Sequence, residues 1–159
     1  MNAQAALADF EAARLEWEAA FARVPDAALA YLKPGDDYAL GGLLVHVNWV
    51  LAHYLRVLEG EVVLHDPPLS SEAHDGLTPA RRAESLAEMS RLHDAVTSAV
   101  ARLDESAWGR VTPVVYGPDE EPYPTTPEDV VGWLRDHYRE HVDQCADLIR
   151  EWSSAARSE

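Results

Sequence analysis

Four long segments of the chain place apolar residues three, four or seven positions apart, which is the spacing of an amphipathic α-helix. The stripes are Leu7, Phe10, Trp17, Phe21 and Val24; Ala39, Leu43, Val50 and Val57; Leu86, Met89, Val96, Val100 and Leu103; and Val130, Leu134 and Leu148. We therefore predict helices over about residues 3–24, 36–59, 78–103 and 126–152. Four amphipathic helices of this length predict an all-α fold, and specifically a four-helix bundle.

Helix start and stop signals support these boundaries. Asp36 and Asp37 are expected to cap the second helix, and Gly60 is expected to end it. Thr78-Pro79 places a capping residue before a proline at the first helical position of the third helix. Thr126–Asp129 gives the fourth helix a cap, a proline and two carboxylates, which the helix dipole favours at this end.

Two long connections, residues 61–77 and 109–125, separate the second, third and fourth helices. A long second connection lets the second and third helices run parallel, so we predict an up-down-down-up order. Inside the later connection, Val114–Tyr116 is expected to form a short extended piece. The whole chain, residues 1–159, has the length of a single domain.

Composition and charge narrow the possible partners. Apolar residues make up 47% of the chain, and the formal net charge is -15. Such a surface repels phosphate backbones and anionic lipid headgroups, so we expect neither a nucleic acid nor a membrane partner. Tyr38–Leu55 carries no charged residue, but it contains His46, Asn48 and His53 and is interpreted as a buried core helix.

The cysteine usage and the N-terminus point to the cytoplasm. Cys145 is the one cysteine, so no internal disulfide can form, and this fits a reducing compartment. Asp9 and Glu11 lie near the start without a basic stretch, so no secretory signal is visible. We expect a cytoplasmic protein.

His137 and His141 are four residues apart on the apolar face of the fourth helix. Two imidazoles buried side by side need partners for their polar nitrogens. One metal ion satisfies both, and imidazole is the commonest metal ligand, so we favour a metal site over two hydrogen-bonded core histidines.

The second helix offers two further inward-facing histidines. His46 and His53 lie about two turns, or roughly 10 Å, apart, so one ion cannot bind both together with the pair on the fourth helix. Spacing alone leaves both open as the third ligand. His93 is expected to be a hydrogen-bonded core histidine, and the loop residues His65 and His74 are expected to be solvated.

Two metalloenzyme patterns are set aside. His137 to His141 reads H-x-x-E-H, but the inverzincins need a larger α/β fold and a distant acidic ligand. The di-iron bundles need Glu-x-x-His repeats, which are not present here. Cys145 follows His141 by four residues, and we interpret it as a small buried apolar residue rather than a catalytic thiol. The tryptophans are expected in the core or in a pocket wall.

Two motifs resemble those of a known family. His46 ends the apolar run Leu43–His46 near the start of the second helix. The fourth helix opens with Thr126–Asp129 and continues with Asp136–Gln144, which is similar to a D-H-x-x-E-H-x-x-Q element. With both motifs in this order, the chain resembles the DinB/YfiT-like superfamily of small metal-binding four-helix proteins over nearly its whole length.

The resemblance implies an up-down-down-up bundle and frequent homodimerisation. It also implies a metal site formed by His46, His137 and His141, which chooses His46 over His53, for one divalent ion of zinc, nickel, manganese or iron. Relatives include transferases and isomerases that use low-molecular-weight thiols, and others are described as metal-dependent hydrolases. The resemblance therefore implies a site without naming a substrate.

We expect a metal-dependent enzyme with three histidine ligands and one open coordination position. A thiol bound there would be held as a thiolate, and a bound water would have its pKa lowered to about 7. The activity would be that of a thiol-dependent transferase or a hydrolase acting on a small molecule. Glu140 either orients or deprotonates the bound group or is a solvated surface carboxylate. The alternative is a non-catalytic bundle that binds a metal or ligand as a dimeric module.

Overall fold

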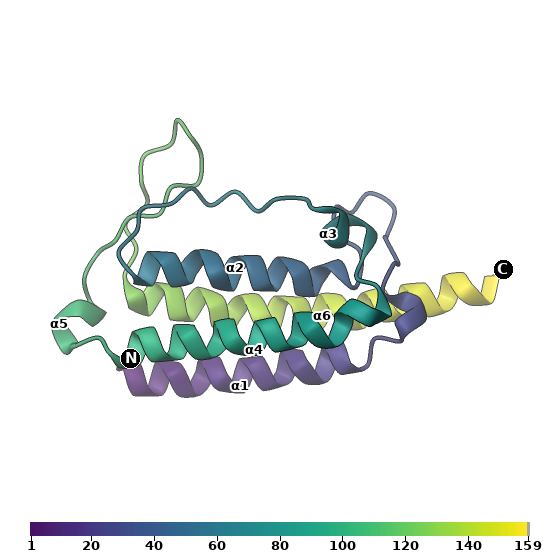
Figure 1. Ribbon diagram of the computed structural model, residues 1–159, viewed down its shortest axis with the longest axis horizontal. Helices are drawn as coiled ribbons and strands as arrows, with labels where there is room; N and C mark the ends of the chain where they lie inside the picture. Colours follow the sequence, from purple (N-terminus) through teal and green to yellow (C-terminus); the bar gives the residue numbers. More distant parts are fainter. Residues whose placement is uncertain (159) are drawn as a thin grey trace.

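The computed structural model describes residues 1–158, and this part of the chain is built from helices without a β-strand. The all-α prediction is therefore confirmed. The helices are α1 (Ala3–Ala22), the 3-10 helix η1 (Asp26–Ala28), α2 (Gly42–Leu58), α3 (Ser71–Asp75), α4 (Pro79–Ala101), α5 (Glu105–Trp108) and α6 (Pro127–Ser158). The long helices α1, α2, α4 and α6 are those that the apolar pattern predicts, and α6 extends beyond the others at one end (Figure 1).

The long helices bury their apolar faces against one another. Helix α1 packs mainly on α6 and α2 packs mainly on α4, while α2 also contacts α6 (Figure 1). Phe10 and Trp17 of α1 and Leu51 of α2 are among the buried side chains of the resulting core. Burial of each large apolar side chain contributes about 1.5–3 kcal/mol, so the apolar stripes account for the association of the helices. None of the helices in residues 1–158 combines the length and apolar character needed to cross a membrane.

Helix α2 begins later than its capping signal predicts. Asp36 and Asp37 lie in the loop before α2 and do not cap it, since its N-cap position is Gly41. The segment from Asp37 to Gly41 is held by a tertiary contact instead, since the Ala39 N–H donates to the carbonyl of Ala73 at 3.0 Å. That bond satisfies the Ala39 N–H, which would otherwise need a helical partner or water. The predicted start of the second helix at about residue 36 is therefore wrong.

Other predicted helix ends are confirmed. Thr126 Oγ1 accepts from the Asp129 N–H at 3.1 Å, and the Thr126 N–H donates to Asp129 Oδ2 at 3.0 Å. This reciprocal cap fixes the start of α6. Thr78 is the N-cap of α4, although its side chain makes no capping hydrogen bond. Helix α2 ends at Leu58, and Gly60 adopts the positive φ of 90° that favours glycine after a helix.

The two long connections meet on one side of the bundle. The connection from α2 to α4 returns along the length of α2 and contains α3, while the connection from α4 to α6 contains α5 (Figure 1). Val115 forms an isolated β-bridge with Leu64, and Val114 forms another with Tyr123. The expected extended piece is therefore present, and it ties one connection to the other.

Helix α3 lies directly against the first turn of α2. A Cβ atom added to Gly42 would lie 1.8 Å from the carbonyl oxygen of Ala73, a distance at which the backbone would have to move. Glycine is needed here because the two backbones approach closely. This contact fixes the start of α2 four residues before His46.

We expect Gly42→Ala to lower the free energy of unfolding by about 1–3 kcal/mol, because the added methyl group must displace α3. The matched control is Gly132→Ala within α6, where the nearest atom to the new Cβ is Arg135 Nη2 at 3.8 Å. Because the new methyl group meets no clash, Gly132→Ala should be about 0.5–1 kcal/mol more stable than the unsubstituted protein. Urea denaturation followed by circular dichroism measures both. Equal stability of the two variants would show that α3 does not hold this contact.

Candidate metal centre

Three histidine side chains from two helices converge at one point. His46 lies in the second turn of α2, and His137 and His141 lie one turn apart in α6. Nε2 of His137 is 3.1 Å from Nε2 of His46 and 3.0 Å from Nε2 of His141. The structure thus brings together the three histidines singled out as candidate ligands, with one nitrogen of each within 4.8 Å of the others.

One hydrogen bond beside the cluster directs a lone pair toward its centre. A neutral imidazole carries one N–H group and one lone pair. Nδ1 of His141 donates to Oε1 of Gln144 at 2.7 Å, which leaves the lone pair of His141 on Nε2. Nδ1 of His46 is buried and has no partner within residues 1–158. The three Nε2 atoms face one another, and neutral rings that carry their protons on Nδ1 cannot satisfy one another's Nε2 lone pairs by hydrogen bonds. A metal ion would accept all three lone pairs, although Nδ1 of His46 would still lack a partner.

Burial keeps the three imidazoles uncharged. It lowers the pKa of His46 to about 4 and that of His137 to about 2, and the neighbouring imidazoles add to the effect. Burial also lowers the pKa of His141, although the hydrogen bond to Gln144 acts in the opposite direction. At neutral pH all three are in the form that binds a metal ion.

The cluster lies on the wall of an open pocket with a volume of about 510 Å³. Its lining comes from α2, α6 and both long connections: His46, Val50, Tyr54, His65, Tyr116, Trp133, Asp136, His137, Glu140 and His141. This volume is typical of sites for small organic molecules. A molecule in the pocket can therefore reach the histidine nitrogens.

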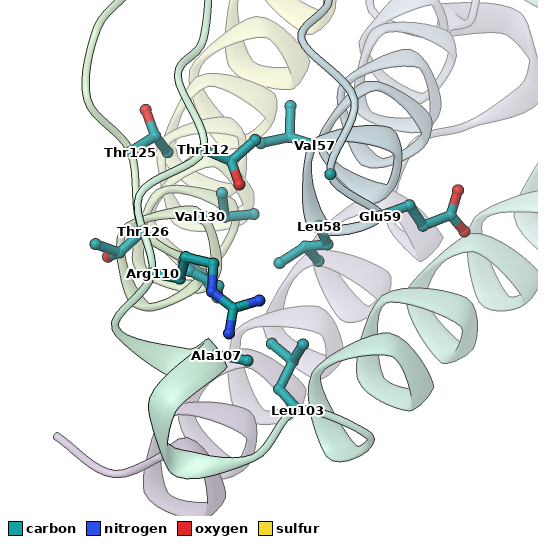
Figure 2. Close-up of a pocket in the computed structure, with 12 residues that line it drawn as sticks. Val57, Leu58, Glu59, Leu103, Ala107, Arg110, Thr112, Thr125, Thr126 and Val130 are labelled. Atoms are coloured by element: carbon teal, nitrogen blue, oxygen red, sulfur yellow. The ribbon is translucent and has the colours of Figure 1, made fainter.

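A second cavity, of about 200 Å³, lies where α2 ends and α6 begins (Figure 2). Val57, Leu103 and Val130 are among its apolar lining residues, and the guanidinium of Arg110 lies beside Ala107 (Figure 2). No histidine lines it. Of these two cavities, only the larger pocket is lined by histidine side chains.

The model of the DinB superfamily matches residues 9–145, a range that includes all three clustered histidines. The chain belongs to the DinB superfamily. A search of the curated proteins found no match to it. Superfamily membership and the three-histidine cluster together fit a metal-binding protein.

His53, the other inward histidine of α2, does not join the cluster of this DinB superfamily protein. Its ring stacks on Trp49 with centroids 5.1 Å apart, and the ring of His65 meets it edge-on at 4.6 Å. Nε2 of His53 is buried without a partner within residues 1–158. The structure therefore brings His46, and not His53, to the pair on α6.

His65 was expected to be solvated, and that expectation was wrong. The residue is half-buried, and its ring centroid lies 5.6 Å from that of Tyr54 and 5.3 Å from that of Tyr116. Its backbone N–H donates to the carbonyl of Val115 at 2.6 Å, which holds it beside the second connection. Neither His65 nor Tyr116 lies on a periodic helical face, so the apolar pattern gave no signal for their place in the pocket.

Three other candidates lie outside the pocket. His93 is a core histidine, as expected, with Nδ1 2.9 Å from the Tyr138 hydroxyl and Nε2 2.8 Å from a Glu11 carboxylate oxygen. Burial raises the pKa of the Cys145 thiol to about 11, so the thiol stays protonated and acts as a small core residue. His74 is half-buried with Nδ1 3.0 Å from a backbone carbonyl oxygen, so it is not simply solvated.

Two carboxylates reach the pocket from α6. Asp136 forms an ion pair with Arg135 at 2.9 Å. Glu140, the candidate catalytic carboxylate, is exposed and forms no ion pair within residues 1–158. Its carboxylate is therefore free to interact with a bound molecule.

The burial of His53 leads to a pH-dependent stability. Burial lowers the pKa of His53 from 6.5 to about 4, and His65 and Arg56 add to the effect. His53 therefore binds a proton more tightly in the unfolded chain than in the folded protein. Stability from this group is present above the unfolded pKa and is lost as the pH falls below it. When the pH falls from about 7.5 to about 5, the free energy of unfolding should decrease in both proteins. The decrease should be about 1–2 kcal/mol smaller in His53→Leu than in the unsubstituted protein.

Urea denaturation of chelator-treated protein at the two pH values measures this difference, because removal of metal excludes pH-dependent metal loss. An identical pH dependence in the two proteins would show that His53 is solvated or charged in the folded state.

Proposed function

We propose that this protein is a metal-dependent enzyme in which His46, His137 and His141 hold one divalent ion beside the 510 Å³ pocket. The observation that carries the proposal is the convergence of three uncharged imidazoles on the wall of an open pocket. A structural ion usually has four protein ligands, whereas three leave one coordination position for another molecule.

The donor set fits a transition metal. Imidazole nitrogen suits zinc, nickel and iron, whereas manganese prefers oxygen ligands, so we rank the first three ahead of manganese. Gln144 supports the fit, because its contact with Nδ1 of His141 holds that ring with Nε2 toward the cluster. A site of this kind needs no movement of α2 or α6 to bring the three nitrogens together.

An ion held in this way would act as a Lewis acid and lower the pKa of a thiol or water in the open position. The protein's own residues bind and orient the reactants. Glu140, on the pocket wall, is proposed to orient the bound group or accept its proton. With a low-molecular-weight thiol the activity would be group transfer to a small electrophile, and with water it would be hydrolysis.

The arrangement of the molecule supports further parts of the proposal. The long connection that returns along α2 supports an up-down-down-up order of the four long helices (Figure 1). The net charge of -15 supports a small-molecule partner and opposes nucleic acid. The free, buried Cys145 is compatible with the cytoplasm. We also propose a homodimer, which light scattering on a size-exclusion column would test.

Protein purified without chelator should contain about one transition-metal ion per chain. His46→Ala should abolish tight binding, because two imidazoles on one helix remain. His53→Ala removes an imidazole from the same helix outside the cluster and should largely keep the metal. Elemental analysis and zinc titration of the metal-free proteins measure both effects.

Thermal melts of the two variants show whether either change has unfolded the bundle, so that loss of metal can be separated from loss of structure. Absence of metal in the unsubstituted protein, with no zinc uptake on titration, would contradict the proposed site. Loss of binding in His53→Ala alone would mean that His53, and not His46, is the ligand that α2 supplies.

The metal-free protein should remain folded. The core is closed by buried apolar side chains from all four long helices, and the clustered imidazoles can be hydrated from the open pocket when no ion is bound. Chelator-treated protein should keep its helical circular dichroism and melt cooperatively, at a somewhat lower temperature because metal binding stabilises the native state. Unfolding at room temperature on chelation would instead indicate a structural ion.

A further inference from the structure

Aromatic rings form a continuous wall of the larger pocket. The ring centroids of Trp133 and Tyr54 are 6.0 Å apart, those of Tyr54 and His65 are 5.6 Å apart, and those of His65 and Tyr116 are 5.3 Å apart. The hydroxyls of Tyr54 and Tyr116 are joined by a hydrogen bond of 3.0 Å. This bond links α2 to the connection before α6, so the wall is already assembled before any molecule binds.

The ionised side chains on the pocket lining are both acidic. Asp136 and Glu140 contribute carboxylates, and neither lysine nor arginine lines the pocket. Arg135 neutralises Asp136 in part, whereas Glu140 has no ion-pair partner within residues 1–158. The net charge of the chain, -15, adds to the negative potential.

These features favour one class of ligand over another. The face of an aromatic ring is negative and attracts an ammonium group within about 6 Å of its centre. Carboxylates in the same pocket strengthen that attraction and repel an anion. Because the side chain of His65 carries no charge at neutral pH, it can form a hydrogen bond without adding repulsion.

We propose that the ligand of this pocket is an organic cation, a protonated amine or quaternary ammonium on an apolar body. Its cationic group lies against the wall formed by Trp133, Tyr54 and Tyr116, and the rest of the molecule extends toward the histidine cluster. Trp133 is one helical turn, roughly 5 Å along the axis, before His137, so an ion bound by the histidines would oppose the ammonium group, and the preference is tested on the metal-free protein. This inference deepens the proposed function and rests on it where it makes the ligand a substrate.

Three small probes with the same phenyl group test the proposal: phenethylammonium, 2-phenylethanol and 3-phenylpropanoate. Calorimetry on metal-free protein should give the ammonium a dissociation constant about tenfold lower than that of the alcohol, with the carboxylate weakest. Trp133→Leu should weaken ammonium binding about fivefold or more, and Glu140→Gln should narrow the preference for the ammonium over the alcohol. The matched control Glu59→Gln removes a carboxylate from the second cavity and should change neither.

Zinc titration of the same samples separates this inference from the metal proposal. Equal affinities for the ammonium and the alcohol, tighter binding of the carboxylate, or no binding of the ammonium would overturn the organic-cation assignment while leaving the three-histidine centre intact. If the protein binds no zinc but still prefers phenethylammonium to the alcohol, the proposed metal centre alone would be overturned.

Discussion

Helices α2 and α6 pack so that Nε2 of His46 lies 3.1 Å from Nε2 of His137, although 91 residues separate them in the chain. The remaining features of the site depend on this contact, because it buries most of the surface of three imidazoles together. Burial lowers their pKa values and keeps them uncharged, and it leaves their lone pairs in need of an electron acceptor. A single positive ion can accept all three lone pairs, whereas hydrogen bonds among the three rings cannot satisfy all of them.

The position of His46 depends in turn on close backbone packing outside the site. Helix α3 rests on Gly42 one turn earlier, and the Ala39 N–H is bonded to the same Ala73 carbonyl that Gly42 approaches. On α6, Tyr138 follows His137 and bonds to His93, which is bonded to Glu11. Contacts of this kind hold both helices that carry the histidines, so the site is built on rigid elements.

The two long connections give the pocket its character. They place His65 and Tyr116 beside the histidines that α2 and α6 carry. The bridge between Leu64 and Val115 joins the connections, and the neighbouring residues His65 and Tyr116 then line the pocket beside Tyr54. The helices thus supply the three clustered imidazoles and part of the aromatic wall, while the connections complete that wall.

The sequence alone determined the all-α class, the four long helices, the superfamily and the inward face of His137 and His141, because helical periodicity and capping are local properties. Local spacing left His46 and His53 equivalent, and only the resemblance to a family preferred one. The start of α2 at Gly42 and the burial of His65 depended on contacts with segments far along the chain. Tertiary structure alone decided these features, because a loop has no period to reveal its inward face and a backbone donor can be satisfied by a distant carbonyl as well as by a local cap.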